Sequence, residues 1–350
     1  MADRSVKLKD SLIIGGGFPV SVQTMWKEPL RLQDAEPGSA ALARITRLQA
    51  LGCDVLRFAA PDLAQAEILG ALAALTGMPL VADIHFDWRI ALRCLDFPIA
   101  KIRLNPGNIG ERRKVAEVAA KARDKGVPIR IGVNAGSLPA DLRSRPDRAA
   151  AVVEAAEREV AVLEELGFSD LVVSMKVSDP DETVAANELF ASRHGIPLHL
   201  GVTEAGPLIA GVARNAAALV PLLKKGIGDT IRVSLSDSME SEVIAAREIL
   251  SCAGARKSGA TIVSCPRCGR ASFDTHAFAA RWSEKLYALG KTATIAAMGC
   301  VVNGPGEARH ADLGITGAGD KVVIFRKGQI ARTIAPEEAD TVFQEELEKL

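Results

Sequence analysis

Eight short runs of mostly apolar, often β-branched residues recur through the first 240 residues, and this repetition is the strongest constraint on the fold. They read VSVQTM (20–25), DVLRFA (54–59), PLVADI (79–84), IAKIRLN (99–105), PIRIGVN (128–134), DLVVSMKVS (170–178), PLHLGVTE (197–204) and TIRVSLS (230–236). Seven of the eight gaps that follow them contain an amphipathic stretch long enough for a helix. Near-continuous apolar strands alternating with helices predict a parallel sheet covered on both faces. Eight such units predict an α/β fold, a (β/α)8 TIM barrel.

A doubly wound sheet is the alternative fold for such a pattern. That fold has fewer strands as a rule, and a glycine-rich turn follows its first strand. No G-x-G-x-x-G follows the first run here, and IGGG (14–17) precedes it instead. We interpret IGGG as part of an N-terminal hairpin that forms a turn or a plug at the bottom of the barrel.

The pattern changes after about residue 250, which indicates a second, smaller domain. We predict a substrate-binding barrel over 1–250, a linker over 251–260 and a smaller α/β domain over 261–350. The polar start MADRSVKLKD and the lack of a long apolar run lead us to expect a cytoplasmic protein that does not enter membranes. The formal net charge of zero gives no reason to expect nucleic-acid binding.

Polar residues gather at the C-terminal ends of the predicted strands, which form the catalytic face of a barrel. They are Gln23, Arg57, Asp83, His85, Arg103, Asn105, Arg130, Asn134, Lys176, His199, Glu204, Arg232 and Ser234. Burying a cation costs several kcal/mol unless it is paired. Asp83 and Glu204 could pair with only two of the five cations in this set. The set therefore predicts an anionic ligand, most simply a diphosphate, because arginine matches phosphate oxygens.

The second domain contains a spacing typical of metal sites, Cys265-x2-Cys268-x31-Cys300-x6-Glu307. Nearby Pro and Gly residues favour irregular backbone whose N–H groups can point at anionic sulfur. Three thiolates and one oxygen ligand suit an iron–sulfur cluster, whereas the cysteines with His276 or His310 suit zinc. The residues alone leave these two alternatives open. Cys53, Cys94 and Cys252 stand singly and are expected to be small buried residues.

Three functions are compatible with these features. They are a diphosphate enzyme with a catalytic cluster, a phosphate-ligand TIM-barrel enzyme with a structural zinc ribbon, and a non-catalytic electron carrier. A carrier does not need five cations in the barrel, so this third reading is disfavoured.

Several long motifs also resemble those of the bacterial 4-hydroxy-3-methylbut-2-en-1-yl diphosphate synthase family, and the resemblance runs nearly end to end. They include ADIHFDWRIAL (82–92), KIRLNPGNIG (101–110), IRIGVNAGSL (129–138), HLGVTEAGP (199–207), SCPRCGR (264–270) and GCVVNGPGEA (299–308). The resemblance implies an oxygen-sensitive 4Fe–4S oxidoreductase of the methylerythritol phosphate route to isoprenoids. Such an enzyme reductively opens 2-C-methyl-D-erythritol 2,4-cyclodiphosphate and eliminates water.

The resemblance also assigns residue roles. It implies that Cys265, Cys268, Cys300 and Glu307 hold the cluster, with Glu307 as the labile ligand, and that Asp83 and Glu204 are the acid–base carboxylates. The residues that it implies for substrate binding are Arg57, Arg103, Asn105, Arg130, Asn134, Lys176, Arg232, Ser234 and Asn303.

The family's partners are also implied, namely flavodoxin or ferredoxin as electron donor. A head-to-tail homodimer is implied as well, in which the cluster domain of one subunit caps the barrel of the other. One departure is evident in QTMWKEPL (23–30), where Trp26 and Lys27 replace small polar residues of the family. We interpret the change either as a harmless loop substitution or as an altered edge of the pocket.

Overall fold

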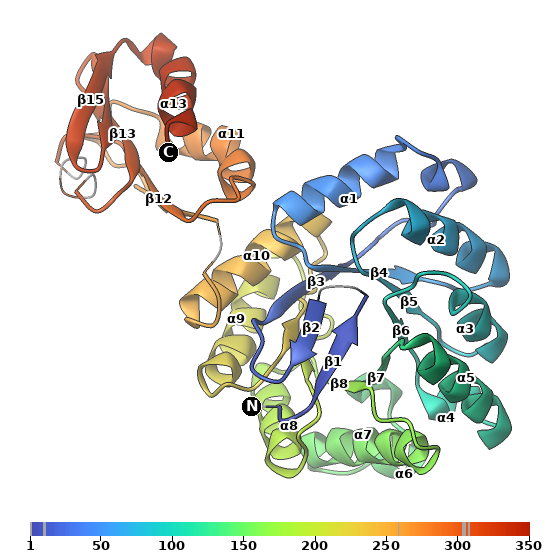
Figure 1. The fold of residues 1–350 in the computed structure, drawn as a ribbon. Helices are drawn as coiled ribbons and strands as arrows, with labels where there is room; N and C mark the ends of the chain where they lie inside the picture. The colour runs from blue at the N-terminus through green and yellow to red at the C-terminus, as the bar shows by residue number, and fades with distance from the viewer. Residues whose placement is uncertain (1, 10–11, 258, 303–305, 307–308) are drawn as a thin grey trace. The chain divides into compact units, whose positions relative to one another are not determined.

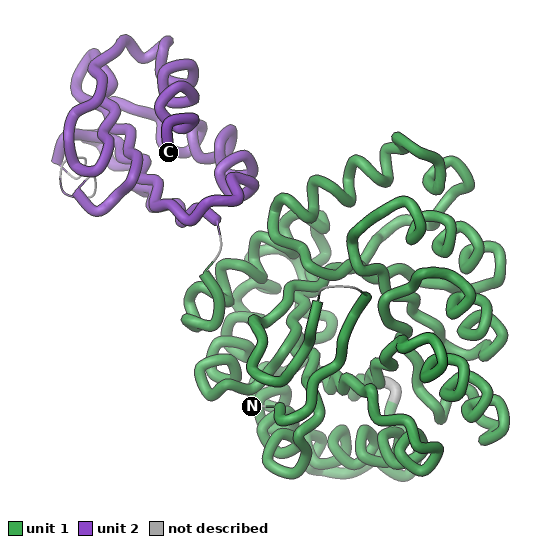
Figure 2. The backbone as a smooth tube through the Cα atoms, viewed as in Figure 1, with its two compact units in different colours: residues 1–257 green, residues 258–350 purple. Residues whose placement is uncertain are grey.

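The computed structural model describes residues 2–9, 12–257, 259–302, 306 and 309–350 (Figure 1). The chain divides into two compact units, residues 1–257 and residues 258–350 (Figure 2). We describe each unit by itself.

Unit 1 is a barrel of parallel strands, which confirms the predicted fold. The strands are β3 (Ser21–Met25), β4 (Val55–Ala59), β5 (Leu80–Asp83), β6 (Lys101–Arg103), β7 (Ile129–Asn134), β8 (Leu171–Lys176), β9 (His199–Leu200) and β10 (Thr230–Ile231). Their order in the sheet is β8-β7-β6-β5-β4-β3-β10-β9. A bridge between Val173 of β8 and Leu198, just before β9, joins the two ends of this sheet.

A helix follows every strand of the barrel, and Figure 1 shows these helices arranged around the strands. The long ones are α1 (Ala40–Ala50), α2 (Leu63–Leu75), α3 (Trp88–Cys94), α5 (Arg112–Lys125), α7 (Arg148–Glu165), α8 (Pro180–Arg193), α9 (Leu208–Lys224) and α10 (Met239–Cys252). Shorter turns are η1 (Leu32–Ala35), α4 (Pro106–Ile109), η2 (Ala135–Ser137) and α6 (Ala140–Arg143). Most long helices begin at a side-chain cap, as Ser39, Asp62 and Asp179 do, and this satisfies a backbone N–H of the first turn.

The N-terminal hairpin closes the bottom of the barrel, as the sequence predicts. It consists of β1 (Ser5–Leu8) and β2 (Leu12–Gly15), paired antiparallel. Its inward side chains pack in one buried cluster with residues of the barrel strands and of the turn before β6, namely Val6, Leu8, Ile14, Val55, Val81, Ala100 and Val172. Gly15 has a φ of 88°, and a Cβ at this position would lie 2.4 Å from the carbonyl oxygen of Arg4. The turn into the barrel therefore requires glycine here.

Unit 2 is a five-stranded sheet with helices packed against it. The strands are β11 (Ala260–Ser264), β12 (Ala293–Met298), β13 (Leu313–Ala318), β14 (Lys321–Arg326) and β15 (Gln329–Ile334). They lie in chain order, with β11, β12 and β13 parallel and the rest antiparallel. The helical elements are α11 (Thr275–Tyr287), η3 (Pro336–Glu338) and α13 (Ala339–Glu348).

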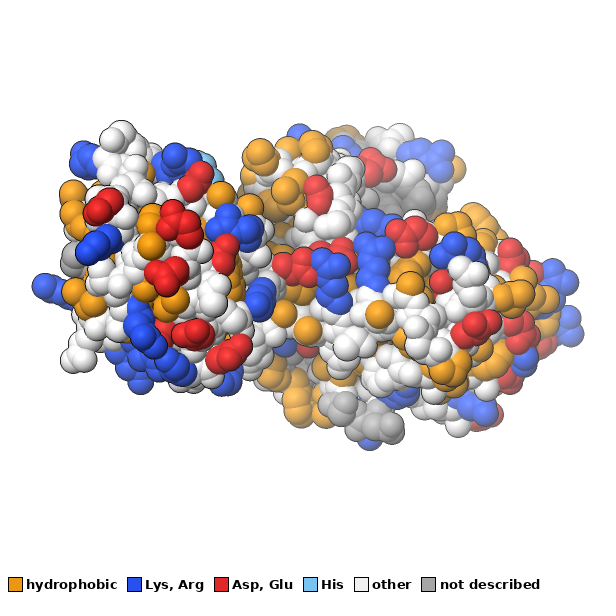
Figure 3. Space-filling view, turned by 90° about the horizontal axis from the view of Figure 1, so that it is seen from above, with side chains coloured by type: hydrophobic (Ala, Val, Ile, Leu, Met, Phe, Trp, Pro, Cys, Tyr) orange, Lys and Arg blue, Asp and Glu red, His pale blue; other side chains and the backbone are white. Residues whose placement is uncertain are grey.

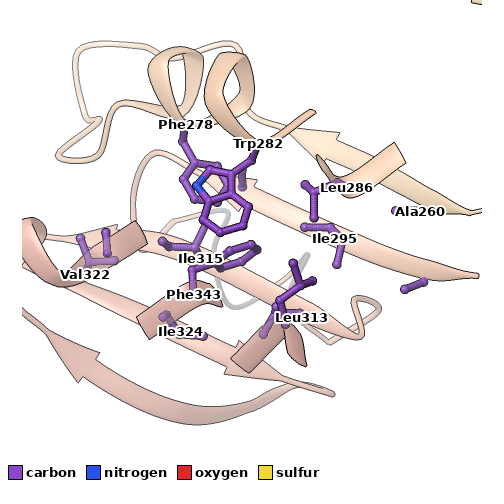
Figure 4. Packing of buried hydrophobic residues seen from close by; sticks show 14 residues of the cluster. Ala260, Phe278, Trp282, Leu286, Ile295, Leu313, Ile315, Val322, Ile324 and Phe343 are labelled. Atoms are coloured by element: carbon purple, nitrogen blue, oxygen red, sulfur yellow. The ribbon is translucent and has the colours of Figure 1, made fainter. Parts of the chain in front are cut away.

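Three aromatic side chains form the centre of the unit 2 core. Phe278 and Trp282 of α11 each have their ring centroid 4.9 Å from that of Phe343 of α13, in edge-on geometry (Figure 4). Such pairs contribute beyond the area they bury. The core gives unit 2 a hydrophobic centre of its own.

Regular structure reaches further into the expected 251–260 linker than the sequence suggests. Helix α10 continues to Cys252 and strand β11 begins at Ala260. Burial explains both ends, because Leu250 is held against the barrel and Ala260 belongs to the core of unit 2. None of the helices in the described parts of the chain combines the length and apolar character needed to cross a bilayer.

Candidate active site

A polar cavity of about 130 Å³, partly open to solvent, lies at the C-terminal end of the barrel strands. It is lined by Arg57, Asp83, His85, Arg103, Arg130, Gly132, Asn134, Ser174, Lys176, Thr203, Arg232 and Ser234. Most of the barrel residues singled out from the sequence are therefore brought together in one place. Asn105 and Glu204 are not part of this lining.

The two-residue period of the strands gathers these side chains. Arg130, Gly132 and Asn134 alternate along β7, so they face the same side of the sheet. Gly132 is paired in register with Ser174, and Asn134 with Lys176, on the neighbouring strand β8. Most lining residues are thus fixed by the strand that carries them, whereas His85, Thr203, Arg232 and Ser234 lie beyond a strand end.

Asp83 organises the arginines on one side of the cavity. Its carboxylate lies 3.1 Å from Arg57 Nη2 and 3.5 Å from Arg103 Nη1, and His85 Nδ1 lies 3.8 Å away. Burial by itself would raise the pKa of Asp83, but Arg57, Arg103 and Arg130 hold the pKa of this carboxyl below its usual value. Asp83 is therefore an ionised group that orients two guanidinium groups.

Asn105 stabilises the pocket wall from behind. Its Nδ2 donates to the carbonyl of Gly132 at 2.8 Å, and its Oδ1 accepts from Gly132 N at 2.9 Å. Arg103 Nη2 also donates to the Gly132 carbonyl at 2.9 Å. Both ends of the Asn105 amide are occupied by backbone, which differs from the direct contact with a ligand expected from the sequence.

Glu204 is exposed in the loop after β9, one residue beyond the lining residue Thr203. Its backbone has a φ of 52°, in the left-handed region that non-glycine residues seldom adopt. The flanking residues Val202 and Ala205 are buried and belong to one hydrophobic cluster. The loop is therefore anchored on both sides of Glu204, whose backbone is strained and whose carboxylate is exposed.

Glu242 is a functional candidate that the sequence reasoning missed. This buried residue of the first turn of α10 lies 3.3 Å from both Nε and Nη2 of Arg232. It also accepts hydrogen bonds from Thr24 Oγ1 at 2.6 Å and from Leu235 N at 3.0 Å. A signal was present, because a carboxylate in the first turn after the last strand must lie near the barrel mouth.

The departure at Trp26 and Lys27 lies beside the cavity rather than in it. Lys27 Nζ is 3.1 Å from Glu242 and donates to the carbonyls of Leu235 and Asp237. Trp26 is buried and stacks on Phe58 with 5.3 Å between ring centroids. Lys27 and Arg232 share Glu242 as a partner. A different residue at position 27 can therefore alter the pocket edge through this carboxylate, which is the second of the two interpretations.

The two strand-end histidines differ in their surroundings. His199 is fully buried, with Nε2 3.4 Å from Lys176 Nζ. Burial and the nearby cations Lys176 and Arg130 lower its pKa well below the usual value, so His199 is neutral. The His85 side chain is 54% exposed at the mouth, where it can meet a ligand or solvent.

The cavity carries an excess of positive charge. Its five cations are Arg57, Arg103, Arg130, Lys176 and Arg232. Within the described part of the chain, Asp83 pairs with Arg57 and Arg103, and Glu242 pairs with Arg232, whereas Arg130 and Lys176 form no ion pair. Burial lowers the pKa of Arg57 to about 10, and that of Arg130 falls too. An anionic ligand would relieve this repulsion. On the outer surface, in contrast, acidic and basic side chains are interspersed over much of the face in Figure 3.

Unit 2 brings two of its cysteines to one edge of the sheet. Cys265 directly follows β11 and Cys300 follows β12, and these strands are parallel neighbours with Ser264 opposite Ala297. A Cβ placed on Gly299 would lie 3.8 Å from Cys265 Sγ, so the segment before Cys300 passes close to this thiol. Cys268 is exposed in the same loop as Cys265. The edge therefore carries three sulfur donors.

The rest of the predicted ligand set is only partly described. Glu307 and Asn303 lie outside the described residues. Among the residues that are described, no three Cys, His, Asp or Glu side chains are close enough together to hold a metal ion. His276 has its Nε2 3.1 Å from the Pro266 carbonyl, and His310 is exposed. Of the single cysteines, Cys53 and Cys94 are buried as predicted, but Cys252 is exposed because it ends α10.

These features define a TIM-barrel protein whose mouth is lined by buried cations, joined to a separate α/β unit that carries a cysteine-rich edge. Residues 3–247 match the model of the GcpE TIM-barrel domain, and residues 261–349 match that of the GcpE protein C-terminal domain. The chain belongs to the GcpE family.

Curated relatives match over nearly the whole chain. A protein of Treponema pallidum is 53% identical over 97% of this chain and 89% of its own length, and one of Treponema denticola is 50% identical over 97% and 95%. A Geobacter sulfurreducens protein is 45% identical over 96% and 95%. All three are named 4-hydroxy-3-methylbut-2-en-1-yl diphosphate synthase (flavodoxin).

Among solved structures, Yersinia pestis dihydropteroate synthase superposes with a TM-score of 0.51 at 14% identity. The match covers 72% of this chain and 97% of that one. At this identity the likeness concerns the barrel fold alone.

Proposed function

We propose that this chain is a 4-hydroxy-3-methylbut-2-en-1-yl diphosphate synthase of the methylerythritol phosphate pathway. In this reaction 2-C-methyl-D-erythritol 2,4-cyclodiphosphate takes up two electrons and two protons, its ring opens, and water leaves. The names of the full-length relatives support the assignment. The structural observation that carries it is the excess of buried cations at the barrel mouth, because a cyclic diphosphate supplies the missing negative charge.

The proposal gives the barrel residues distinct tasks. Arg57, Arg103, Arg130, Lys176 and Arg232 neutralise the diphosphate oxygens, and Asn134 and Ser234 add hydrogen bonds. Asn105 supports the site without contacting the ligand itself. It fixes the backbone of Gly132, whose carbonyl also accepts a hydrogen bond from Arg103.

The acid–base roles follow from charge and exposure. Asp83 is ionised and paired with two arginines, so near neutral pH it cannot donate a proton and serves to orient those arginines. Glu204 is exposed on an anchored loop beside the mouth, and we assign proton transfer to this carboxylate.

The proposed cofactor is a 4Fe–4S cluster held by Cys265, Cys268 and Cys300, with Glu307 as the fourth ligand. The position of Cys265 and Cys300 after adjacent parallel strands fits this donor set. When bound, the cluster supplies electrons to the substrate one at a time. The name of the relatives favours flavodoxin over ferredoxin as the donor.

We include a head-to-tail homodimer in the proposal, as the family resemblance implies. Each unit exposes apolar side chains close to its own site, Phe86 and Ile209 in unit 1 and Val301 and Val302 in unit 2. Exposed apolar residues of this kind are expected where surfaces are covered by association.

Anaerobic purification tests the assignment. The expected result is a brown protein with iron and acid-labile sulfide that converts the cyclodiphosphate when reduced flavodoxin is supplied. Electron paramagnetic resonance of the reduced protein should change when the cyclodiphosphate is added. A colourless protein containing stoichiometric zinc and no iron would replace the proposal with the zinc-ribbon alternative.

A further inference from the structure

A buried lysine lies one layer beneath the pocket. Lys101 begins strand β6 and is fully buried. Arg103 follows two residues later on the same face of the strand, and the register places Arg103 beside Asp83 but Lys101 beside Val81. Lys101 is therefore one side-chain layer deeper than the Asp83–Arg103 pair that lines the cavity.

The layer around Lys101 is polar, although barrel interiors are usually filled by branched apolar residues. Lys101 Nζ has no hydrogen-bond partner within the described parts of the chain. The same holds for both polar atoms of the Gln23 amide, for Thr230 Oγ1 and for His199 Nδ1. Thr230 pairs in register with His199 on β9, and Gln23 follows on the other neighbouring strand, β3. Buried, unpaired polar groups of this kind are unfavourable for packing, so we look for a function.

The charged groups facing Lys101 are mostly cations. The positive charges of Arg130 on β7 and Arg57 on β4 act on Lys101, and neutral His199 of β9 is also within its electrostatic range. The carboxylates in reach of these arginines, Asp83 and Glu242, are already paired with Arg57, Arg103 and Arg232. Burial and the two arginines lower the pKa of Lys101 well below its usual value.

An arginine cannot release its proton in a protein, whereas a lysine can. Positive charge that the ligand-free barrel cannot tolerate is therefore lost from amines. Lys176 is another such amine, but it lines the cavity and contacts His199. Among the described residues Lys101 Nζ has no hydrogen-bond partner, and Lys101 is not part of the cavity lining.

We propose that Lys101 is a buried counterion that takes up a proton from solvent when a diphosphate occupies the barrel mouth. The amine is neutral in the ligand-free barrel and becomes an ammonium beneath the bound ligand. The inference rests on the proposed function only in that the ligand is the cyclodiphosphate. Because binding and protonation are linked, each strengthens the other, and binding becomes weaker as the pH rises.

The test is calorimetric titration of the cyclodiphosphate into the full-length chain without reductant, so that no turnover occurs. Each phosphoryl group of this ligand carries one strongly acidic proton, and its charge is therefore fixed near neutral pH. Titrations in buffers with different heats of ionisation count the protons taken up. We expect at least ~1 proton per ligand in the unmodified chain.

Two variants separate the contribution of Lys101. K101M should lower the uptake by about one proton and weaken binding roughly tenfold or more, because the counterion is lost. K101R should also lose this proton uptake, since its charge is permanent, but should bind with little dependence on pH. K224M, at an exposed position near the end of α9, is the matched control and should leave uptake unchanged.

Undiminished uptake in folded K101M would overturn the inference and assign the proton to Lys176 or His199. No uptake in the unmodified chain would overturn it as well. If K101M does not fold, K101R and the pH dependence of binding to the unmodified chain decide the question. Failure of the cyclodiphosphate to bind at all would instead contradict the proposed function.

Discussion

Glu242 and Arg232 form a two-point ion pair at the barrel mouth, with Arg232 Nε and Nη2 each 3.3 Å from a carboxylate oxygen. The pair links the first turn of α10 to Arg232, which directly follows β10. Glu242 is buried, and it also holds Lys27 and the backbone of Leu235. Its carboxylate thereby fixes the direction in which Arg232 faces the cavity.

We expect E242Q to weaken cyclodiphosphate binding about tenfold and to lower the free energy of unfolding by roughly 2 kcal/mol, because two cations lose a buried partner. Titration calorimetry and urea unfolding measure the two effects. E240Q is the matched control, since Glu240 of the same helix pairs with the partly exposed Arg44, and binding should not change. Equal losses of binding in both variants would show that Glu242 does not orient Arg232.

Asp83 should make stability depend on pH in acid. Its pKa is lower in the folded chain than in the unfolded chain, so its stabilising contribution is present above about pH 4 and is lost as the pH falls through the folded value. D83N should therefore be less stable than the unmodified chain at neutral pH, and the difference should shrink in acid. Urea unfolding across this range measures the change. D124N, at an exposed position on α5, should follow the unmodified chain throughout.

Gly132 leaves room for Arg103 within the pocket wall. A Cβ at this position would lie 2.8 Å from Arg103 Nε, and the flexible guanidinium would have to move. G132A should therefore fold normally but bind the cyclodiphosphate about tenfold more weakly, since Arg103 is displaced from its hydrogen bonds. At Gly77 an added Cβ meets nothing within 4 Å, so G77A should bind as the unmodified chain does. Normal binding by G132A would remove Arg103 from the ligand site.

The metal content of cysteine variants should distinguish the cysteines at the edge of unit 2 from the other cysteines. C265S and C300S should lose iron and acid-labile sulfide after anaerobic reconstitution, because thiolates hold such clusters. C252S should retain both, since Cys252 is exposed at the end of α10, away from this edge in sequence. Full iron content in C300S would contradict the proposed ligand set.

The barrel and its cationic mouth could be predicted from the sequence because both follow from short-range periodicity. Alternate positions on a strand share a face, so Arg130 and Asn134 had to point the same way once β7 was recognised. The position of Glu242 after the last strand indicated a place near the mouth, but its pairing with Arg232, 10 residues earlier, could not be predicted because only the fold brings the two side chains together. The role of Asn105 escaped for a similar reason, since its partner Gly132 belongs to the next strand.

How deep a side chain lies within the barrel also could not be predicted from the sequence. Lys101 and Arg103 are indistinguishable as cations in one apolar run, and only the pairing of β6 with β5 separates a pocket residue from one layer below it. The lengths of β9 and β10 were overestimated, because residues after Leu200 and Ile231 leave the ladder at the barrel rim.

The N-terminal hairpin makes the barrel a tube with one open end. Val6, Leu8 and Ile14 close it against Val55 and Val172, and all five are buried. Among the described residues, these apolar side chains lie between the layer around Lys101 and the bottom of the barrel, whereas the polar cavity opens to solvent at the other end. We therefore expect the proton to reach Lys101 through the mouth as the ligand binds and to return to solvent by the same route as the ligand departs.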